Sequence, residues 1–153
     1  KTLWSDTFSC LMSPENALVQ AYNLESYLKA NHIWVSKTGF GIGVGVNPKD
    51  VQRLGWVDEA LVRIGEKRRI SVFTRHYQVA MLLAQQHDLV ATLPSRAAQL
   101  NTKSSDLVMK APPFDIPAFE LKMAWSPLLH HNADHQWLRQ LITNIASQGE
   151  SSP

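Results

Sequence analysis

Residues 69–100 read RISVFTRHYQVAMLLAQQHDLVATLPSRAAQL, and this stretch decides the fold class. The short apolar run Ile70–Phe73 predicts a strand, and a helical pattern of roughly His76–Gln86 follows it. A second run, Leu89–Thr92, predicts another strand, and Ser95–Leu100 continues as a helix. Strands that alternate with helices are typical of an α/β fold with a largely parallel sheet.

The same alternation extends to both ends of the chain. Further strands are predicted at Thr7–Met12, His32–Val35, Leu107–Lys110 and Phe119–Trp125, and further helices at Leu24–Ala30, Trp56–Ile64 and Ala133–Ala146. Asn23 and Thr74 stand where they can cap the helices that follow them, and Pro94 stands at the first helical position before Ser95–Leu100. Gly65 is expected to end the helix Trp56–Ile64. We expect residues 1–110 to form a mostly parallel sheet with helices on both faces.

The composition describes a globular chain. Of 153 residues, 44% are hydrophobic and 18% are charged, which does not fit a disordered tail. The formal net charge of +2 is too small to indicate a nucleic-acid surface. The basic triplet Lys67–Arg69 is expected to form a solvated turn, and the neighbouring acids Asp58 and Glu59 a solvated helix face.

Cys10 is the single cysteine, so an internal disulfide is excluded and a reducing compartment is favoured. Its strand-like surroundings predict a buried, inert thiol. No apolar stretch reaches the length of a membrane span, and no signal peptide is visible. The chain opens without a Met, inside a strand-like segment, and we therefore expect a fragment of a longer protein.

Two motifs raise the question of a metal or a cofactor. In HHNADHQWLRQLI (130–142), His131 and His135 have the spacing of a helical zinc pair, but Asn132 is a good N-cap and would leave His131 outside the helix. Glycines alternate over residues 39–45 without a P-loop or dinucleotide pattern, which favours a loop at the rim of a cleft. We expect neither a metal nor a cofactor.

A third stretch, FTRHYQVAMLLA (73–84), is compatible with a binding site. A helix that follows a strand offers free backbone N–H groups at the carboxyl edge of the sheet, where open α/β sheets bind ligands. Thr74, His76 and Tyr77 stand at that opening. Either these residues are only caps and surface, or they line a pocket for a small anionic ligand. No serine lies in a hydrolase G-x-S-x-G motif.

Several stretches occur together in a familiar order: GWVDEALVRIGEKRRISVF (55–73), DLVATLPSRAA (88–98) and LKMAWSPLLHHNADHQWLRQLI (121–142). Together they resemble the effector-binding domain of LysR-type transcriptional regulators. In that family the domain is similar to a type 2 periplasmic binding protein, with two α/β lobes joined by crossover strands. The positions that match the family's last strand and last helix are Trp125, Pro127, Trp137, Leu138 and Arg139.

The resemblance implies a domain layout. Residues 1–111 correspond to lobe II, residues 112–148 to the crossover and the returning part of lobe I, and residues 149–153 to a tail. The family's helix-turn-helix and the first part of lobe I have no counterpart here. Trp125 and Trp137 are therefore expected to have few core partners.

The resemblance also implies a function: sensing of a small molecule, possibly an anion, in an interlobe cleft by a cytoplasmic regulator. The implied partners are the effector, DNA through a helix-turn-helix absent from this chain, and further copies in a homodimer or homotetramer, with no membrane. The implied effector site consists of Ser36, Lys37, Thr38, Thr74, Arg75, His76, Tyr77, Thr92 and Pro94. The alternatives are an extracytoplasmic solute-binding protein of the same fold and, less compatible with the absence of catalytic motifs, a small α/β enzyme.

Overall fold

The structure, a computed structural model, describes residues 1–35, 55–102 and 106–148. The chain divides into two compact units: Thr7–Pro117 form one, and Lys1–Asp6 with Ala118–Pro153 form the other. The glycine-rich stretch and the tail of the sequence analysis lie outside the described residues.

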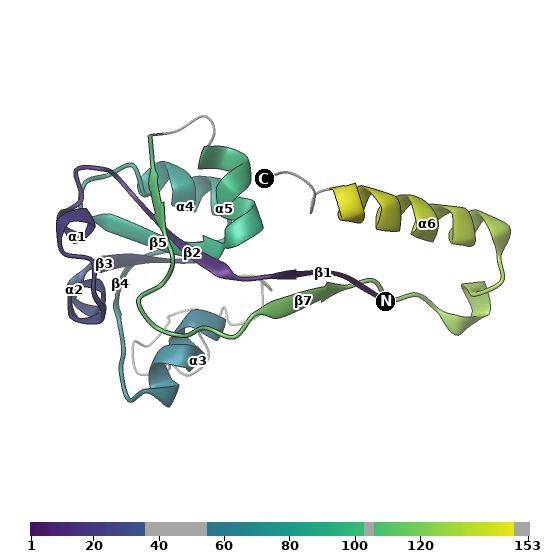
Figure 1. Ribbon diagram of the computed structural model, residues 1–153, viewed down its shortest axis with the longest axis horizontal. Helices are drawn as coiled ribbons and strands as arrows, with labels where there is room; N and C mark the ends of the chain where they lie inside the picture. The colour runs from purple at the N-terminus through teal and green to yellow at the C-terminus, as the bar shows by residue number, and fades with distance from the viewer. Residues whose placement is uncertain (36–54, 103–105, 149–153) are drawn as a thin grey trace. The chain divides into compact units, whose positions relative to one another are not determined.

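Within the described residues, the larger unit contains a five-stranded sheet of order β4-β3-β5-β2-β6 (Figure 1). The strands are β2 (Phe8–Met12), β3 (Asn31–Val35), β4 (Arg69–Thr74), β5 (Leu89–Pro94) and β6 (Val108–Lys110). β3 pairs in parallel with β4 and β5, whereas β2 pairs antiparallel with β5 and β6. β2 therefore runs against its neighbours in an otherwise parallel sheet, and the predicted α/β class is confirmed.

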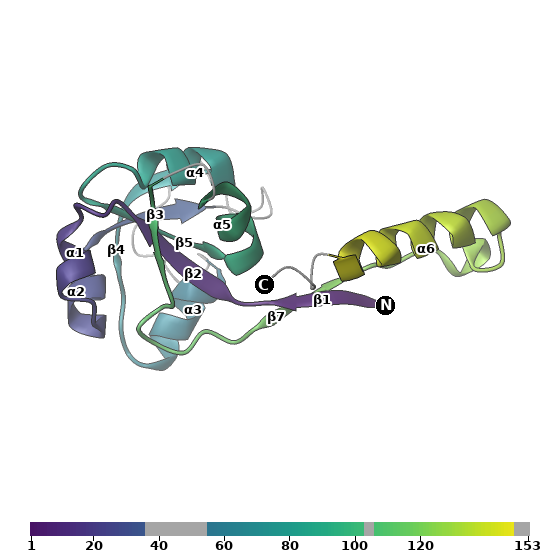
Figure 2. The ribbon, with the colours of Figure 1, turned by 45° about the horizontal axis from the view of Figure 1, so that its top comes forward.

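Helices cover both faces of this sheet (Figures 1 and 2). The helices are α1 (Ala17–Gln20), α2 (Leu24–Lys29), α3 (Trp56–Arg63), α4 (Tyr77–Leu83) and α5 (Ser95–Thr102). On one face, Leu11, Ile33 and Leu93 of the sheet pack against α4 and α5; on the other, Cys10 and Val90 pack against α1, α2 and α3. Alternate residues of each strand supply the two cores, because successive side chains point to opposite faces.

Local sequence signals explain most helix boundaries. The predicted cap at Asn23 is confirmed, since its Oδ1 accepts the Ser26 N–H at 2.9 Å. Gly65 follows α3 with φ of +77°, a conformation that favours glycine. Two predictions are wrong. Thr74 is the last residue of β4 and caps no helix, and Pro94 ends β5, so that α5 begins one residue later.

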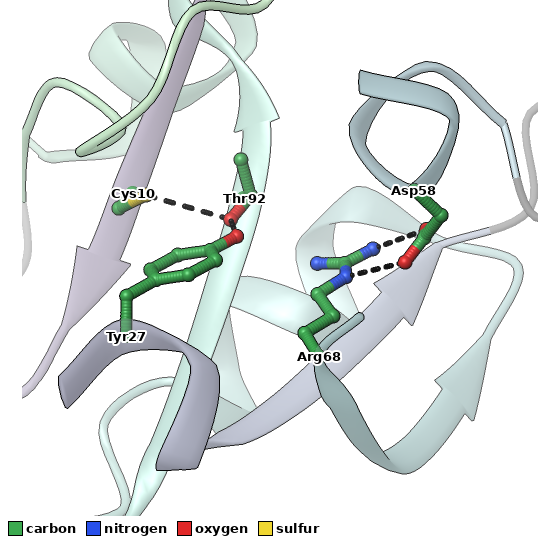
Figure 3. A network of polar contacts seen from close by, with 5 residues as sticks. All are labelled: Cys10, Tyr27, Asp58, Arg68 and Thr92. Atoms are coloured by element: carbon green, nitrogen blue, oxygen red, sulfur yellow. Dashed lines mark hydrogen bonds and ion pairs between the residues drawn. The ribbon is translucent and has the colours of Figure 1, made fainter. Parts of the chain in front are cut away.

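A buried ion pair joins α3 to the chain just before β4. Arg68 Nε and Nη2 donate to the two carboxylate oxygens of Asp58 at 2.8 and 2.7 Å (Figure 3). The side chains are only 3% and 2% exposed, respectively. The prediction that both residues are solvated is therefore wrong, because the bidentate geometry allows each charge to leave water with its partner.

The smaller unit pairs β1 (Thr2–Asp6) antiparallel with β7 (Phe119–Lys122). A 3₁₀ turn, Pro127–Leu129, and α6 (Ala133–Gln148) follow. The strand predicted at Phe119–Trp125 therefore ends three residues early. Lys1–Asp6 pairs with the C-terminal part of the chain and not with the five-stranded sheet.

The apolar face of α6 is largely uncovered within the described residues. We call it the α6 stripe: Trp137, Leu138, Leu141, Ile142 and Ile145. Trp137 is 67% exposed and Ile145 is 61% exposed. Trp125, in contrast, has the Arg139 guanidinium 4.8 Å from its ring centre and the His130 ring stacked at 6.2 Å. The expectation of few core partners is confirmed for Trp137, whereas polar side chains contact Trp125.

The buried pair leads to a stability prediction. Asp58→Asn removes the charge that compensates Arg68, and should lower the free energy of unfolding by about 3–5 kcal/mol, the usual cost of breaking a buried pair. Urea denaturation of the two proteins measures the difference.

Glu59→Gln is the matched control, since Glu59 is the exposed neighbour and its change should stay within about 0.5 kcal/mol. The double variant Asp58→Leu/Arg68→Met should be more stable than Asp58→Asn, because no unpaired charge remains. Equal stability of Asp58→Asn and the wild type would contradict the assignment.

Candidate functional site

The carboxyl ends of three parallel strands define one edge of the sheet. Val35 ends β3 and lies opposite Thr74, which ends β4. Pro94 ends β5 and lies opposite Phe8 of the antiparallel β2. Both α4 and α5 begin just after these strands, so this edge gathers helix starts and the loops that precede them (Figure 1). Ligands of open α/β sheets bind at such an edge.

The turn from β4 to α4 holds four of the predicted site residues. Thr74 Oγ1 accepts the His76 N–H at 3.3 Å, which fixes the turn before the helix. Thr74 and Tyr77 are half-buried, whereas Arg75 and His76 are exposed. No acidic residue lies in the first turn of α4. The turn therefore presents a hydroxyl, a ring and two basic side chains without a carboxylate beside them on the helix.

A cluster of hydroxyls lies at the start of α5. Ser95 Oγ is 3.0 Å from Thr7 Oγ1 and 2.8 Å from Ser9 Oγ. The Ser95 N–H also donates to the Thr7 carbonyl oxygen at 2.9 Å. Sequence reasoning missed this cluster, since Thr7 and Ser9 lie more than eighty residues before Ser95. Only the antiparallel direction of β2 brings them to the carboxyl edge.

Thr74 and the hydroxyl cluster share one face of the sheet. Val72 and Leu11 pack into the core beneath α4 and α5. Thr74 is two residues after Val72 and Ser9 is two residues before Leu11, so both lie on that same face. The face and the edge together define a candidate site of hydroxyls and helix starts.

Thr92 lies elsewhere. Its side chain is on the opposite face, where Oγ1 is 2.8 Å from the Tyr27 hydroxyl and 3.4 Å from Cys10 Sγ (Figure 3). The residue is buried, and its hydroxyl is occupied by these partners. Pro94 is buried at the end of β5. Thr92 and Thr74 therefore lie on opposite faces of the sheet. Pro94, two residues after Thr92 on β5, shares the Thr92 face and not the face that α4 and α5 cover.

Three predicted site residues, Ser36, Lys37 and Thr38, lie outside the described residues. They follow Val35 directly in the chain, and Val35 lies at the same edge as Thr74. Their assignment to the site stays a prediction.

The core on the Thr92 face contains ionisable side chains, and their burial shifts their pKa values. Burial raises the pKa of the Cys10 thiol and of the Tyr27 hydroxyl, which keeps both neutral. His32 is fully buried, and burial together with the Arg68 charge lowers its pKa to about 3. The predicted inert thiol at Cys10 is confirmed by its burial and raised pKa.

The histidine stretch before α6 is a helix cap. Asn132 Oδ1 accepts the His135 N–H at 3.1 Å, so the predicted cap is confirmed. Arg139 donates to the carbonyl oxygens of Leu129 and His130 at 3.2 and 2.8 Å. These bonds close the turn that carries the histidines. Among the described residues, no three His, Cys, Asp or Glu side chains come together as metal ligands would.

No family model matches the chain. Among curated proteins, the chain is 28% identical over 159 residues to the HTH-type transcriptional regulator SyrM 1 of Sinorhizobium fredii, a match that covers 99% of this chain and 43% of that protein. The chain thus spans less than half the length of this curated relative. The match is to a regulator and not to a solute-binding protein.

Solved structures of transcriptional regulators share the fold of this chain. The regulatory domain of MexT, a transcriptional activator in Pseudomonas aeruginosa, superposes with a TM-score of 0.73 at 27% identity, covering 94% of this chain and 63% of that one. CbnR, a LysR family transcriptional regulator, shares the fold with a TM-score of 0.54 at 11% identity, over 95% of this chain and 46% of that one. The chain is thus similar over nearly its whole length to the effector-binding domains of LysR-type regulators.

The residues that carry the LysR-type resemblance now have structural roles. Trp125 and Arg139 contact each other, and Pro127 begins the 3₁₀ turn between them. Trp137 and Leu138 lie on the α6 stripe. In the part of the chain that the structure describes, no helix is both long and apolar enough to cross a membrane.

The burial of His32 predicts a pH dependence. Because its pKa falls from 6.5 to about 3 on folding, the unfolded chain binds more protons between these values. The free energy of unfolding therefore has its full value above pH 6.5. It falls as the pH is lowered, by up to about 1.4 kcal/mol per pH unit. Urea denaturation between pH 7 and pH 5 measures the slope.

His32→Gln should flatten this slope, whereas His131→Gln, at an exposed histidine, should leave it unchanged. An identical slope in wild type and His32→Gln would show that another group titrates.

The capped histidine stretch leads to a second expectation. Because Asn132 caps α6, His131 lies before the helix and His135 within it, and the protein should bind no stoichiometric zinc. Elemental analysis after dialysis against zinc tests this. Zinc at one equivalent that disappears in His131→Ala/His135→Ala would overturn it.

Proposed function

We propose that the chain is the effector-sensing part of a DNA-binding transcription regulator, and that it is not an enzyme. The sequence match to a regulator over 99% of the chain carries this proposal. In the whole protein, a helix-turn-helix outside this chain contacts DNA, the regulator is a homodimer or homotetramer, and it acts in the cytoplasm. The net charge of +2 supports a division in which this part does not contact DNA.

The proposed effector is a small anion at the edge where β4 and β5 end. Thr74, Arg75, His76 and Tyr77 supply a hydroxyl, two basic groups and an aromatic wall, and Ser95 adds a second hydroxyl at the start of α5. Hydroxyls and basic side chains hold a carboxylate through charge-assisted hydrogen bonds. Ser36, Lys37 and Thr38 belong to the proposed wall. We leave Thr92 and Pro94 out of it, because the Thr92 hydroxyl contacts Tyr27 on the opposite face and Pro94, two residues later on β5, shares that face.

Effector binding changes transcription only if the effector binds two states of the regulator with different affinity. We assign the larger unit to lobe II and the smaller unit to the returning part of lobe I. In two-lobed domains of this kind, closure of the lobes on the effector supplies that difference. The site would then be complete only with the remainder of lobe I.

The α6 stripe supports this assignment. A two-stranded sheet is marginally stable alone, and four apolar side chains of α6 remain exposed in the smaller unit. About a third of the MexT regulatory domain has no counterpart in the match. We therefore propose that the corresponding part of the whole protein covers the stripe.

The effector site is tested with Thr74→Ala in the full-length protein. A thermal-shift screen of small carboxylates against their neutral amides first selects a ligand. Loss of the Thr74 hydroxyl should raise the half-effective concentration of that ligand in a transcription assay roughly tenfold, the value of one hydrogen bond to a charged group. DNA affinity without the ligand should not change.

Ser71→Ala is the matched control, because Ser71 lies on the same strand but is exposed, and its hydroxyl donates to Asn31 at the start of β3. An unaltered dose-response curve for Thr74→Ala would remove Thr74 from the site. If the full-length protein bound no DNA fragment, the proposal that it is a DNA-binding regulator would be refuted.

The covered stripe is tested by fluorescence quenching. Acrylamide should quench Trp137 readily in the 153-residue chain and poorly in the full-length protein. Trp137→Phe isolates the contribution of this ring in each protein. Equal quenching of Trp137 in both would show that nothing in the full-length protein covers the stripe.

A further inference from the structure

Three hydroxyl groups lie in a row at the start of α5, with that of Ser95 in the middle. Ser95 Oγ is 3.0 Å from Thr7 Oγ1 on one side and 2.8 Å from Ser9 Oγ on the other. The backbone N–H of Ser95 donates to the Thr7 carbonyl oxygen at 2.9 Å, so this amide is already paired. The group of Ser95 that can still meet a ligand is therefore its hydroxyl and not its amide.

The burial of Ser9 fixes the direction of its hydrogen bond. A hydroxyl carries one hydrogen and can accept two. Ser9 is only 7% exposed, and among the described residues its hydroxyl has Ser95 Oγ as its one partner. If Ser95 donated to Ser9, the hydrogen of Ser9 would be buried without an acceptor in this part of the chain, which is unfavourable. Ser9 therefore donates to Ser95 Oγ.

The contact between Ser95 and Thr7 allows two arrangements. In one, Ser95 donates its single hydrogen to Thr7 Oγ1, and no hydrogen remains for a third group. In the other, Thr7 donates to Ser95 Oγ, so that Thr7 and Ser9 fill both acceptor positions of that oxygen. The Ser95 hydrogen is then directed away from both neighbours. Ser95 is half-buried, so a group outside the chain can reach it.

We propose that Thr7 and Ser9 are positioning residues that make Ser95 a hydrogen-bond donor to the bound effector. An acceptor atom of the effector takes the Ser95 hydrogen, and this selects the arrangement in which Thr7 and Ser9 both donate to Ser95 Oγ. A hydroxyl that accepts hydrogen bonds is polarised by them and donates more strongly. The inference rests on the proposed anion site, of which Ser95 is a part.

This arrangement restricts the chemistry of the effector atom next to Ser95. With both acceptor positions filled, Ser95 Oγ can donate a hydrogen bond but cannot accept another. A carboxylate oxygen fits, and its charge strengthens the bond. An N–H group at the same place would find no acceptor. The site should therefore bind a carboxylate more tightly than the amide of the same compound.

Thr7→Val and Ser9→Ala in the full-length protein test the proposal by calorimetric titration. The probes are small carboxylates, acetate, succinate and benzoate among them, each compared with its neutral amide. Either variant should raise the dissociation constant of a bound carboxylate roughly three- to tenfold, the value of one hydrogen bond. Thr7→Ser keeps the hydroxyl and should bind like the wild type. Thr2→Val is the matched control, because Thr2 is an exposed threonine on β1.

The preference for the carboxylate over its amide separates positioning from a general structural effect. Thr7→Val and Ser9→Ala should reduce this preference, because the carboxylate loses more than the amide when Ser95 donates less strongly. If both variants weakened the two compounds by the same factor, or changed neither, Thr7 and Ser9 would not position Ser95. If the wild type preferred no carboxylate to its amide, the anion site itself would fail, and this inference with it.

Neutron diffraction from the wild-type protein with a bound carboxylate observes the arrangement directly, and decides the matter if the variants do not fold. The deuterium on Ser95 Oγ should point to the carboxylate, and those of Thr7 and Ser9 should point to Ser95 Oγ. A Ser95 deuterium directed at Thr7 or Ser9 would overturn the proposal.

Discussion

The direction of β2 is the constraint on which the candidate site depends. β2 lies between β5 and β6 and runs against both. A parallel strand in this place would put its first residues at the amino edge of the sheet. Because β2 is reversed, Thr7 and Ser9 reach the edge where β4 and β5 end, and their hydroxyls contact Ser95. The site is thus assembled from both ends of the larger unit's sequence.

Periodicity predicted most of the elements, because those strands and helices are set by local patterns, but it gave no strand at Thr2–Asp6 (β1) and no helix at Ala17–Gln20 (α1). The strands at Thr7–Met12, His32–Val35 and Leu89–Thr92 and the helix at Trp56–Ile64 all occur within one or two residues of the expected bounds. The α/β class follows from their order. The order of elements along the chain does not determine the direction of each strand in the sheet, so the antiparallel direction of β2 could not be predicted from it.

Tertiary pairing was the part that the sequence could not supply. Two neighbouring acids on a helix and a basic triplet each predict solvent exposure. Only the contact between Asp58 and Arg68, ten residues apart, makes their burial possible. Thr92 shows a second limit. Its residue type suits a site, but the alternation of β5 turns its hydroxyl into the opposite core. Residue type indicates chemistry, whereas the face of the strand decides whether a ligand can meet it.

The pairing of β1 with β7 has a consequence for the order of folding. Ser5 and Phe119, which are bonded across this pair, lie 114 residues apart in the sequence. In an unfolded chain, closing so long a loop for one two-stranded sheet is entropically unfavourable. Once the larger unit has folded, its ends at Thr7 and Pro117 are held by that unit, and the remaining closure is short. We therefore expect β1–β7 to form last and open first, which hydrogen exchange would show as faster exchange of its amides than of β3 or β5.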